Sequence, residues 1–540
     1  MTTHASTESL TERAGAAPAD ALAAPRASRA AWIVASVVWV AAALVFWVFD
    51  ALPFMDLPAH AGLIALRHRF ESSPFEQQYF VLASNLGPYS LFRFLGEGFD
   101  RLLGPVGAVR ALATLPVIAT PAALYFARRR LHGERSPTAI FFGVALSFGL
   151  MTLLGFASYL LGLAVLLFVL TLWLCLMSDV DDGRATRARE TEVALAAILL
   201  FVAHGHAFVL GLWLMALTAL VRPNRWARLL RLRALAPAMA LAAYAAWISR
   251  QGVVPPGSAP LPAAPFAPVF QNPLEKLALL VTATMTTRTG LDVIAGIVVW
   301  TLVLVGAVRT LRGVRRVSDA SSIDSTSIAH SRALLWAAGA VGIVFLALPH
   351  SIGWFGFVDG RLVPLLLFLL LMALQRPFLG PIDGALDRAA PAVATLLVAL
   401  ALAGSYRFQD EARGYREVLA RVPAEARVLN LPLDPNSDVF TAHPFIHYDK
   451  LVLAERPIVV SDVWFHQGTA LYPTAKNPAL RLPPTYSESN LRKIEWPTYA
   501  LGDWDYVLIR TRPEGSPGPL PDALSLEAHE GGWWLYRATK

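Results

Sequence analysis

The sequence has 540 residues, of which 55% are hydrophobic and only 16% are charged, and its mean hydropathy is +0.50. Soluble proteins carry about 25% charged residues, so this chain has too few charges to coat several soluble domains. The composition excludes a soluble enzyme, a disordered protein and a coiled coil, and it indicates a polytopic membrane protein. The formal charge of +7 is small and spread out, which argues against a nucleic-acid partner. A single cysteine, Cys175, excludes a disulfide framework and a cysteine-ligated zinc site.

The N-terminal part predicts a tail and a first membrane span. Residues 1–30 are mainly Ala, Thr, Ser and Glu, which is typical of a disordered cytoplasmic tail. The apolar run Ala31–Phe49 is long enough to cross a bilayer core of roughly 30 Å. No small-residue cleavage site follows this run, so we predict an uncleaved first helix. Further spans, for a total of about 11, are predicted near residues 105–127, 138–154, 157–177, 192–203, 206–221, 234–249, 291–308, 333–349, 362–375 and 388–404.

Arginine clusters orient these spans, because loops on the cytoplasmic side carry an excess of basic residues. If the N-terminus is inside, nearly every arginine cluster falls in a cytoplasmic loop. This agreement favours an odd number of spans. It places residues 31–404 in a membrane domain with a long first outer loop, 50–104, and residues 405–540 outside. The predicted cytoplasmic loops are 128–137, 178–191, 222–233, 309–332 and 376–387.

The C-terminal segment, 405–540, has a different composition from the spans. It contains charges, prolines and short apolar runs bounded by turn residues, which predict buried strands. Residues Gln409–Arg421 predict a helix before the first strand, so we expect a small extracytoplasmic α/β domain. No internal repeat is visible, which weakens a transporter built from inverted repeats. The predicted strands are Arg427–Leu433, Pro457–Ser461, Tyr506–Arg510 and Trp533–Arg537.

The first outer loop contains an acidic residue and a histidine directly after the first span. Pro58 fits the first turn of a helix that runs to about Phe70. Asp56 lies just before that turn, where the helix dipole favours an anion, and His60 is four residues further on. A second amphipathic stretch, Tyr89–Leu103, follows, and both stretches are predicted to lie on the membrane surface. Spacing alone leaves open that Asp56 is a helix cap and that His60 is an interfacial polar residue.

An aspartate at the end of the first span, followed by a long outer loop with surface helices, resembles the GT-C superfamily of membrane glycosyltransferases. That superfamily includes protein O-mannosyltransferases and lipid A aminoarabinose transferases. The resemblance covers the layout of most of the chain. It implies a donor sugar on polyprenyl phosphate, an inverting transfer, and a catalytic role for Asp56 with His60 beside it. Leu57 stands where many relatives have a second acid, and Asp50 is the only other acid nearby, so the sequence leaves metal dependence open.

Basic residues in later outer segments are expected to bind the donor phosphate. Arg361 lies at the start of a span on the outer side, and a guanidinium matches phosphate geometry. The resemblance implies that Arg361 is the phosphate ligand, assisted by His350, His204 and His206. The alternatives are a salt bridge from Arg361 to Asp359, snorkelling to lipid headgroups, and simple packing of the histidines. Two histidines in an H-x-H pattern are too few for a zinc site.

The topology brings separated segments to one membrane face. We therefore predict that the residues Asp56, His60, His204, His206, His350 and Arg361 form one shared site. A basic patch in the first loop, formed by Arg67, His68 and Arg69, is predicted to bind anionic lipid headgroups. The Pro- and Ala-rich segment 250–275 is expected to cover the site.

The C-terminal segment contains polar and aromatic residues that suit a ligand. Metal binding by its histidines and acids stays open, although no tight ligand spacing is present. The tryptophans Trp464, Trp496 and Trp504 suit carbohydrate stacking or plain packing, and a role in acceptor binding is favoured. The polar and aromatic residues in question are His443, His447, Asp449, Asp462, Trp464 and His466.

Together these features predict an integral membrane glycosyltransferase at the outer face of a bacterial cytoplasmic membrane. The sugar and the acceptor, whether glycan, lipid or protein, stay open. A transporter or lipid flippase is the first alternative, but the spans are nearly free of Asp, Glu and Lys, which disfavours ion coupling. A non-catalytic scaffold with an outer binding domain is the second alternative. The Ala- and Arg-rich composition indicates a GC-rich bacterial genome.

Overall fold

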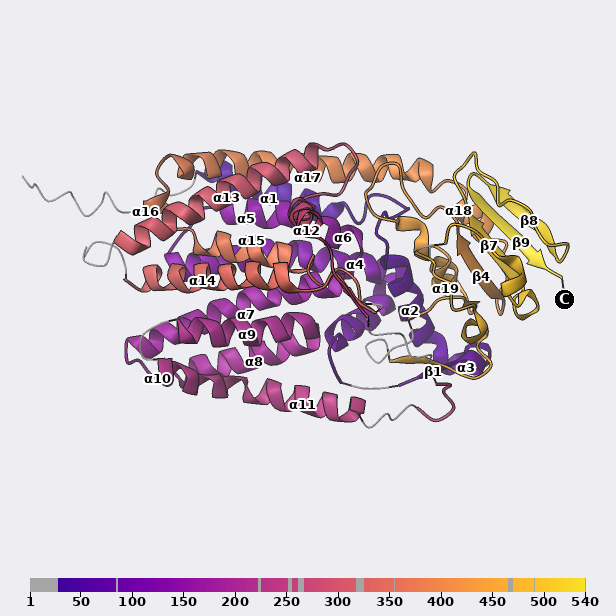
Figure 1. Cartoon of the computed structure of the whole chain (residues 1–540), viewed down its shortest axis with the longest axis horizontal. Coiled ribbons are helices and arrows are strands. Elements are labelled where there is room, and N and C mark those ends of the chain that lie inside the picture. Colours follow the sequence, from indigo (N-terminus) through magenta and orange to yellow (C-terminus); the bar gives the residue numbers. More distant parts are fainter. Residues whose placement is uncertain are drawn as a thin grey trace, which may run out of the picture.

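A bundle of helices with a β-sheet closing one end makes up the chain (Figure 1). The computed structural model describes residues 28–83, 86–221, 225–250, 255–260, 267–316, 325–353, 355–464, 470–489 and 491–539. The tail prediction for residues 1–30 therefore falls outside the described residues, except for its last three positions.

Every predicted span coincides with a helix or a pair of helices. Six helices of the described part are long and apolar enough to cross a membrane, and α1, α9 and α15 are shorter apolar helices. The total of about 11 spans therefore stays a prediction. The helices of the bundle are α1 (Arg29–Leu44), α4 (Ser90–His132), α5 (Thr138–Leu146), α6 (Leu150–Leu153), α7 (Ala157–Asp181), α8 (Arg187–Ala203), α9 (Gly205–Leu220), α10 (Arg225–Leu229), α11 (Ala236–Arg250), α13 (Leu291–Arg316), α14 (Ser325–Ala347), α15 (Leu362–Ala373) and α17 (Pro381–Glu411).

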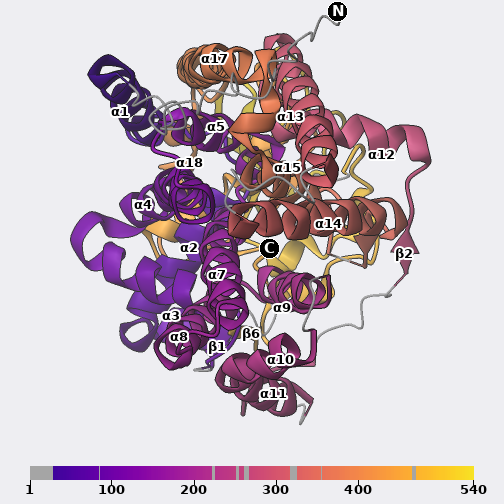
Figure 2. The ribbon, with the colours of Figure 1, turned by 90° about the vertical axis from the view of Figure 1, so that its left-hand side faces the viewer.

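Burial differs strongly between helices. Helix α7 lies near the centre of the bundle when it is viewed from the end opposite the sheet (Figure 2), and 83% of its apolar window is buried. Helices α1, α11 and α12 (Pro273–Leu279) lie at the periphery of the same view. Only 17% of the apolar window in Arg225–Arg250 is buried. An apolar helix that exposes so many side chains is suited to lipid contact.

One predicted span is interrupted, and two neighbouring predicted spans are separated where expected. The span 138–154 breaks between α5 and α6, because Gly149 is extended there and a Cβ atom on it would lie 2.4 Å from the carbonyl oxygen of Ala283. Between α8 and α9 the backbone of His204 is extended, and its Nδ1 atom accepts a hydrogen bond of 3.4 Å from the backbone of Ala207. A side-chain acceptor at this position satisfies an orphan N–H at the start of α9.

Helix α4 combines a predicted surface stretch with a predicted span. The two parts meet at Gly104, where φ is 71°, a conformation that glycine adopts at little cost. The first part packs against α2 (Leu57–Arg69), whose basic residues face acids of α4 or α3 (Pro74–Tyr79). Headgroup binding by this patch stays a prediction, because its side chains are also paired within the protein. The pairs are Arg67 with Glu97 at 2.8 Å, His68 with Asp100, and Arg69 with Glu76 at 2.9 Å.

The C-terminal segment docks onto the segment 50–104, between α1 and the second part of α4. Strand β1 (Phe80–Leu82) pairs antiparallel with β6 (Leu471–Pro473). Helix α19 (Lys450–Glu455) packs on α2, where a Cβ atom on Gly62 would lie 3.0 Å from the side chain of Leu453. This close approach fixes α2 relative to the C-terminal segment.

The main sheet has the order β5-β4-β7-β9-β8. Strands β5, β4 and β7 run parallel to one another, β9 runs antiparallel to β7, and β8 runs antiparallel to β9. All four strands predicted from the sequence are present, and β8 was missed because most of its positions are exposed at the edge of the sheet. The strands are β4 (Arg427–Pro432), β5 (Val459–Val460), β7 (Tyr506–Arg510), β8 (Leu524–Glu530) and β9 (Trp533–Ala538).

The single helix predicted over Gln409–Arg421 is wrong. Helix α17 continues from the last predicted span to Glu411, and a short helix, α18 (Tyr415–Leu419), follows. Gly414 separates them with φ 85°, a conformation that ends a regular helix.

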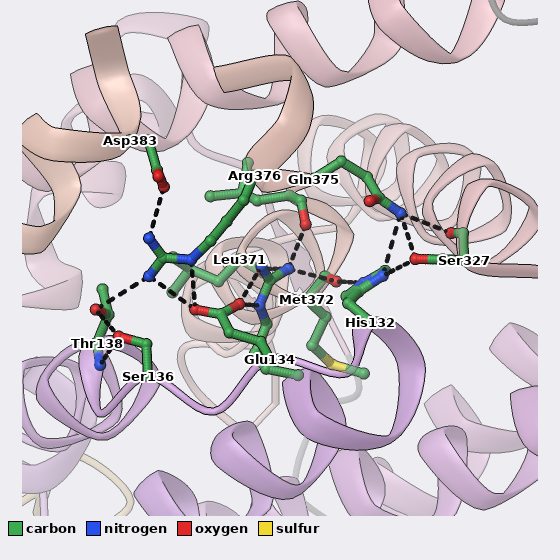
Figure 3. Close-up of polar contacts among 12 residues, drawn as sticks. His132, Glu134, Ser136, Thr138, Ser327, Leu371, Met372, Gln375, Arg376 and Asp383 are labelled. Atoms are coloured by element: carbon green, nitrogen blue, oxygen red, sulfur yellow. Dashed lines mark hydrogen bonds and ion pairs between the residues drawn. The ribbon is translucent and has the colours of Figure 1, made fainter. Parts of the chain in front are cut away.

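A network of charges ties the helices together at the end opposite the sheet, where α10 and α16 (Arg376–Leu379) lie (Figure 1). Figure 3 shows the Arg376 guanidinium between Glu134, at 2.9 Å, and Asp383, at 2.7 Å. Arg128 donates a second bond of 2.7 Å to Glu134. These pairs join α4, α16 and α17, and a network that is satisfied in this way makes the local structure rigid.

Candidate active site

Asp56 occupies the N-cap position of α2, and Pro58 lies in the first turn as predicted. The Asp56 side chain makes no capping hydrogen bond. Only 13% of it is exposed. Capping therefore does not explain this buried carboxyl group, which is left to act on something other than its own helix.

The connection between α6 and α7 positions Asp56. Gly155 has φ +78°, and a Cβ atom on it would lie 2.8 Å from both the backbone nitrogen and the Cβ atom of Asp56. The neighbouring Met55 donates a backbone hydrogen bond of 2.9 Å to Leu153. Glycine at position 155 thus allows the start of α2 to approach the membrane helices closely.

A histidine from the C-terminal segment faces the same carboxyl group. His447 ends the 3-10 turn Pro444–His447, and its Nε2 atom lies 3.7 Å from Oδ1 of Asp56. Its Nδ1 atom lies 3.0 Å from Oε2 of Glu488. The ammonium group of Lys450 lies 2.6 Å from the same Glu488 oxygen. Asp56 is therefore the first member of a chain of charged groups that extends into the C-terminal segment.

The surroundings of Asp56 raise its proton affinity. Burial raises the pKa of the Asp56 carboxyl to about 7, against the opposing effects of His447 and Arg361, and the charge of Asp462 adds to the rise. Near neutral pH this group therefore exists both as a carboxylate and as an acid. A group with a pKa near the working pH is well suited to general acid–base catalysis.

Arg361 is held in a box of aromatic rings. Its guanidinium carbon lies 4.1 Å from the ring centre of Phe355, 4.4 Å from that of Phe156 and 5.6 Å from that of Tyr159. The guanidinium donates a bond of 3.3 Å to the carbonyl of Gly356. Its buried Nε atom has no hydrogen-bond partner among the described residues. A buried guanidinium with an unused donor is prepared to bind an anion.

The expected alternatives for Arg361 are wrong. Asp359 is instead paired with Lys276 at 3.1 Å and with His350 at 2.9 Å. Snorkelling also fails, because only 7% of Arg361 is exposed. The same contacts place His350 on Asp359, so the structure does not bring its ring onto the guanidinium of Arg361.

His204 and His206 lie beside this aromatic box. The ring centre of His204 is 4.7 Å from that of Tyr89 and 5.3 Å from that of Tyr159, both in edge-on contacts. His206 stacks on Tyr159 at 6.0 Å and lies 6.1 Å from Phe355. In the described part of the chain, the buried Nδ1 atom of His206 has no hydrogen-bond partner. The predicted grouping of these two histidines with Arg361 is thus consistent with the geometry.

His60 faces aromatic side chains. Its ring lies 4.8 Å from Phe92 and 5.1 Å from Trp464. Trp464 in turn lies 5.5 Å from His447, edge-on. His60 therefore reaches the site through Trp464, and its backbone N–H donates a hydrogen bond of 3.0 Å to the carbonyl of Asp56 within α2.

Comparison with known structures identifies this arrangement at the level of the fold. The aminoarabinose transferase ArnT from Cupriavidus metallidurans, in its apo state, superposes with a TM-score of 0.55 at 12% identity over 94% of this chain and 97% of that chain. The chain has the GT-C fold. The apo oligosaccharyltransferase of Archaeoglobus fulgidus is 12% identical over 89% of this chain and 69% of that chain, with a TM-score of 0.43. No protein-family model matches the sequence, and no curated protein is significantly similar to it.

Within this GT-C fold, the acids near Asp56 come from the C-terminal segment and not from the first loop. Asp50 is 78% exposed and lies 3.6 Å from Arg416. Asp462 instead acts on Asp56, and it lies two residues after β5. The carboxyl ends of parallel strands are a common place for ligand sites. The sequence predicts a ligand-binding role for Asp462 and His447, but not that they lie close to Asp56.

The acidic cluster of the C-terminal segment is neutralised by a lysine. Lys450 lies between Asp449, at 3.1 Å, and Glu488, and all three are buried. Within the described ranges, no group of three or more His, Cys, Asp or Glu residues could hold a metal ion. The charged neighbours of His443 are Arg288 and Asp434, so it belongs to a different surface. His466 lies outside the described residues.

The segment 250–275 touches both sides of the site where it is described. Ala259 donates a backbone bond of 2.7 Å to Pro473 in β6. Strand β2 (Pro268–Val269) pairs with β3 (Ser351–Ile352), in the loop that leads to Arg361. Residues 251–254 and 261–266 lie outside the described residues, so the cover over the site stays a prediction.

Proposed function

We propose that this protein is an integral membrane glycosyltransferase that transfers a sugar from a polyprenyl-phosphate-linked donor to an acceptor at the outer face of a bacterial cytoplasmic membrane. One observation carries the proposal. In a chain with the fold of ArnT, a buried carboxyl group with a pKa of about 7, Asp56, lies in the electrostatic field of Arg361, a buried arginine with an unused donor.

The reaction follows from these two groups. Asp56 takes the proton of the acceptor hydroxyl while that oxygen attacks the anomeric carbon of the donor. The bond from the anomeric carbon to the phosphate oxygen breaks, and polyprenyl phosphate leaves with the electron pair. Arg361 meets the growing charge on the phosphate, where a donor fixed in advance lowers the barrier. A single displacement inverts the anomeric configuration.

A small apolar cavity lies next to Asp56. It is enclosed by α2, α4, α5, α6, α7, α15 and the segment that follows α1, and its wall includes Leu57, the neighbour of Asp56. It has room for about one water molecule and is too small for an isoprenoid chain. Its larger lining residues are Phe46, Leu57, Val117, Leu146, Leu160 and Phe368.

The proposed topology has about 11 spans, a cytoplasmic N-terminus and residues 405–540 outside. It is supported by the position of helices α10 and α16, which carry arginines and lie at the end opposite the sheet (Figure 1). We assign acceptor binding to the C-terminal segment, because Trp464 and His447 face the first loop from that segment.

The test compares purified wild-type protein with Asp56→Asn in lipid. Each is incubated with a panel of polyprenyl-phosphate sugars, and release of free polyprenyl phosphate is measured. Release by the wild type and at least about 100-fold less by the variant is expected, because loss of a general base costs 10²–10⁴-fold. No release from any donor by a folded wild type would favour transport or scaffolding. Equal release by both proteins would overturn the assignment of Asp56.

A further inference from the structure

The C-terminal segment contributes a buried charged chain that begins at Asp56 and has no role in the reaction as described above. His447 is 8% exposed and lies between two carboxyl groups, with Asp56 at 3.7 Å on Nε2 and Glu488 at 3.0 Å on Nδ1. Glu488 also accepts hydrogen bonds from Lys450, from the side-chain nitrogen of Asn430 at 2.9 Å, and from the hydroxyls of Tyr486 at 3.1 Å and Ser461 at 3.5 Å. A purely structural histidine would not need an acid on both ring nitrogens.

The state of Glu488 determines the tautomer of His447. Burial would raise the pKa of Glu488, but its contacts with Lys450 and His447 hold this pKa at about 2. Glu488 is therefore ionised and only accepts hydrogen bonds, so Nδ1 of His447 must be the donor. The Nε2 atom is left to face Asp56. An acid that orients a histidine in this way also stabilises its protonated form.

We infer that His447, oriented by Glu488, is a positioning residue that sets the protonation state of Asp56. The inference deepens the proposed function and rests on it. Asp56, not His447, contacts the reacting hydroxyl group. The C-terminal segment thus supplies part of the catalytic apparatus as well as a surface for the acceptor.

The step balances as follows. The new bond joins the acceptor oxygen to the anomeric carbon, and the old bond from that carbon to the phosphate oxygen breaks with its electron pair on the phosphate. The hydroxyl proton passes to the Asp56 carboxylate, whose proton affinity His447 and Asp462 adjust. Solvent removes this proton afterwards, and no further reactant is required.

In the described part of the chain, the charged groups that act on the pair come from five separate places. Asp56 is influenced by His447 from the 3-10 turn, by Arg361 from the start of α15 and by Asp462 from the end of β5. His447 is influenced by Glu488, and also by Asp462 and the buried Asp449, which is next to Lys450 in the chain. His447 and Asp462 act on Asp56 with opposite sign, and this difference makes a decisive test available.

The test reads the protonation of Asp56 directly. Infrared spectra of the purified protein are recorded across a pH titration, and the spectrum of Asp56→Asn is subtracted to isolate the carboxylic acid band of Asp56. Removing a cation that lies within about 4 Å should raise the midpoint by about one pH unit. His447→Gln and His447→Asn are therefore expected to shift the midpoint upward, and Glu488→Gln should do so by a smaller amount. Asp462→Asn should shift it downward.

The same variants are assayed with the donor panel. The midpoint of the pH–rate profile is expected to follow the infrared midpoint, with kcat lowered about tenfold or more and the donor KM unchanged. Because two histidine variants and Glu488→Gln are all measured, the test still decides if one of these proteins fails to fold. An unchanged infrared midpoint in the folded histidine variants would overturn the inference. If the wild type is inactive with every donor, the proposed function fails, while the infrared midpoints still decide whether His447 sets the protonation of Asp56.

Discussion

Gly155 and Asp56 are in backbone contact, although 99 positions separate their numbers in the chain. A Cβ atom on Gly155 would lie 2.8 Å from the backbone nitrogen of Asp56, closer than real Cβ atoms approach. The φ angle of Gly155, +78°, also disfavours any other residue. The carboxyl group proposed to be catalytic is therefore positioned by a membrane helix connection as well as by its own loop.

Gly155→Ala should displace Asp56 and reduce turnover. A misplacement of about 1 Å can lower a rate about 100-fold, and we expect a loss of that order in kcat with a smaller change in the donor KM. Gly339→Ala in α14 is the matched control, because a Cβ atom there would meet nothing within 4 Å. Steady-state release of polyprenyl phosphate measures both. Full activity in folded Gly155→Ala protein would show that this contact does not position the carboxyl group.

The pH dependence of turnover should report the ionisation of Asp56. Since burial raises its pKa to about 7 and only the carboxylate can accept a proton, kcat should fall about tenfold per pH unit below that value. A pH–rate profile measures the midpoint. A flat profile between about pH 5 and pH 8 would contradict the assignment of Asp56 as the base.

The same shift predicts an effect on stability. A carboxyl group whose pKa is higher in the folded than in the unfolded state stabilises the fold at low pH, and this contribution is lost as the pH rises through about 7. Asp56→Asn removes the ionisation, so the variant should have a higher Tm than the wild type at about pH 8 and little advantage at about pH 4. Thermal unfolding at both pH values checks the sign, which would be reversed if Asp56 were stabilised as an anion.

Variants of Arg361 should distinguish the contribution of its charge to phosphate binding from that of its planar shape. Arg361→Lys keeps the positive charge but loses the planar group that stacks on Phe156 and Phe355. We expect an affinity for polyprenyl phosphate about tenfold lower in this variant and lower still in Arg361→Gln, as binding titrations would measure. Arg416→Lys, whose side chain is 59% exposed, is the matched control. If the wild type, Arg361→Lys and Arg361→Gln bound polyprenyl phosphate with equal affinity, Arg361 would not belong to the phosphate site.

The sequence predicts those features that depend on local patterns. Apolar runs locate the membrane helices, and short apolar runs between turn residues locate four of the five strands in the main sheet. Pro58 marks the start of α2 and thus the position of Asp56. Breaks such as the one at Gly149 escape this reasoning, because they depend on the close approach of Ala283, a residue distant in sequence.

The contacts of the site that the sequence does not predict depend on the tertiary structure. His447 was expected to serve acceptor binding, and Glu488 was not singled out. Both lie hundreds of residues from Asp56, and nothing in the spacing indicates that the C-terminal segment folds against α2. Arg361 was expected near the site on charge and topology, but its aromatic box comes from two other segments, which no local pattern connects.

Lys450 is expected to stabilise the C-terminal segment. It is 2% exposed and lies between Asp449 and Glu488, so Lys450→Met would leave buried carboxyl groups without a cation. Removing one member of a buried pair costs about 3–5 kcal/mol. We expect a clear fall in the Tm of the purified protein, whereas the exposed Lys476→Met should change little. Adding Glu488→Gln to Lys450→Met should recover part of the loss, because one fewer charge is then buried. If the single variant is as stable as the wild type, the lysine is not what neutralises this cluster, and the ionised state of Glu488 that orients His447 would need another source.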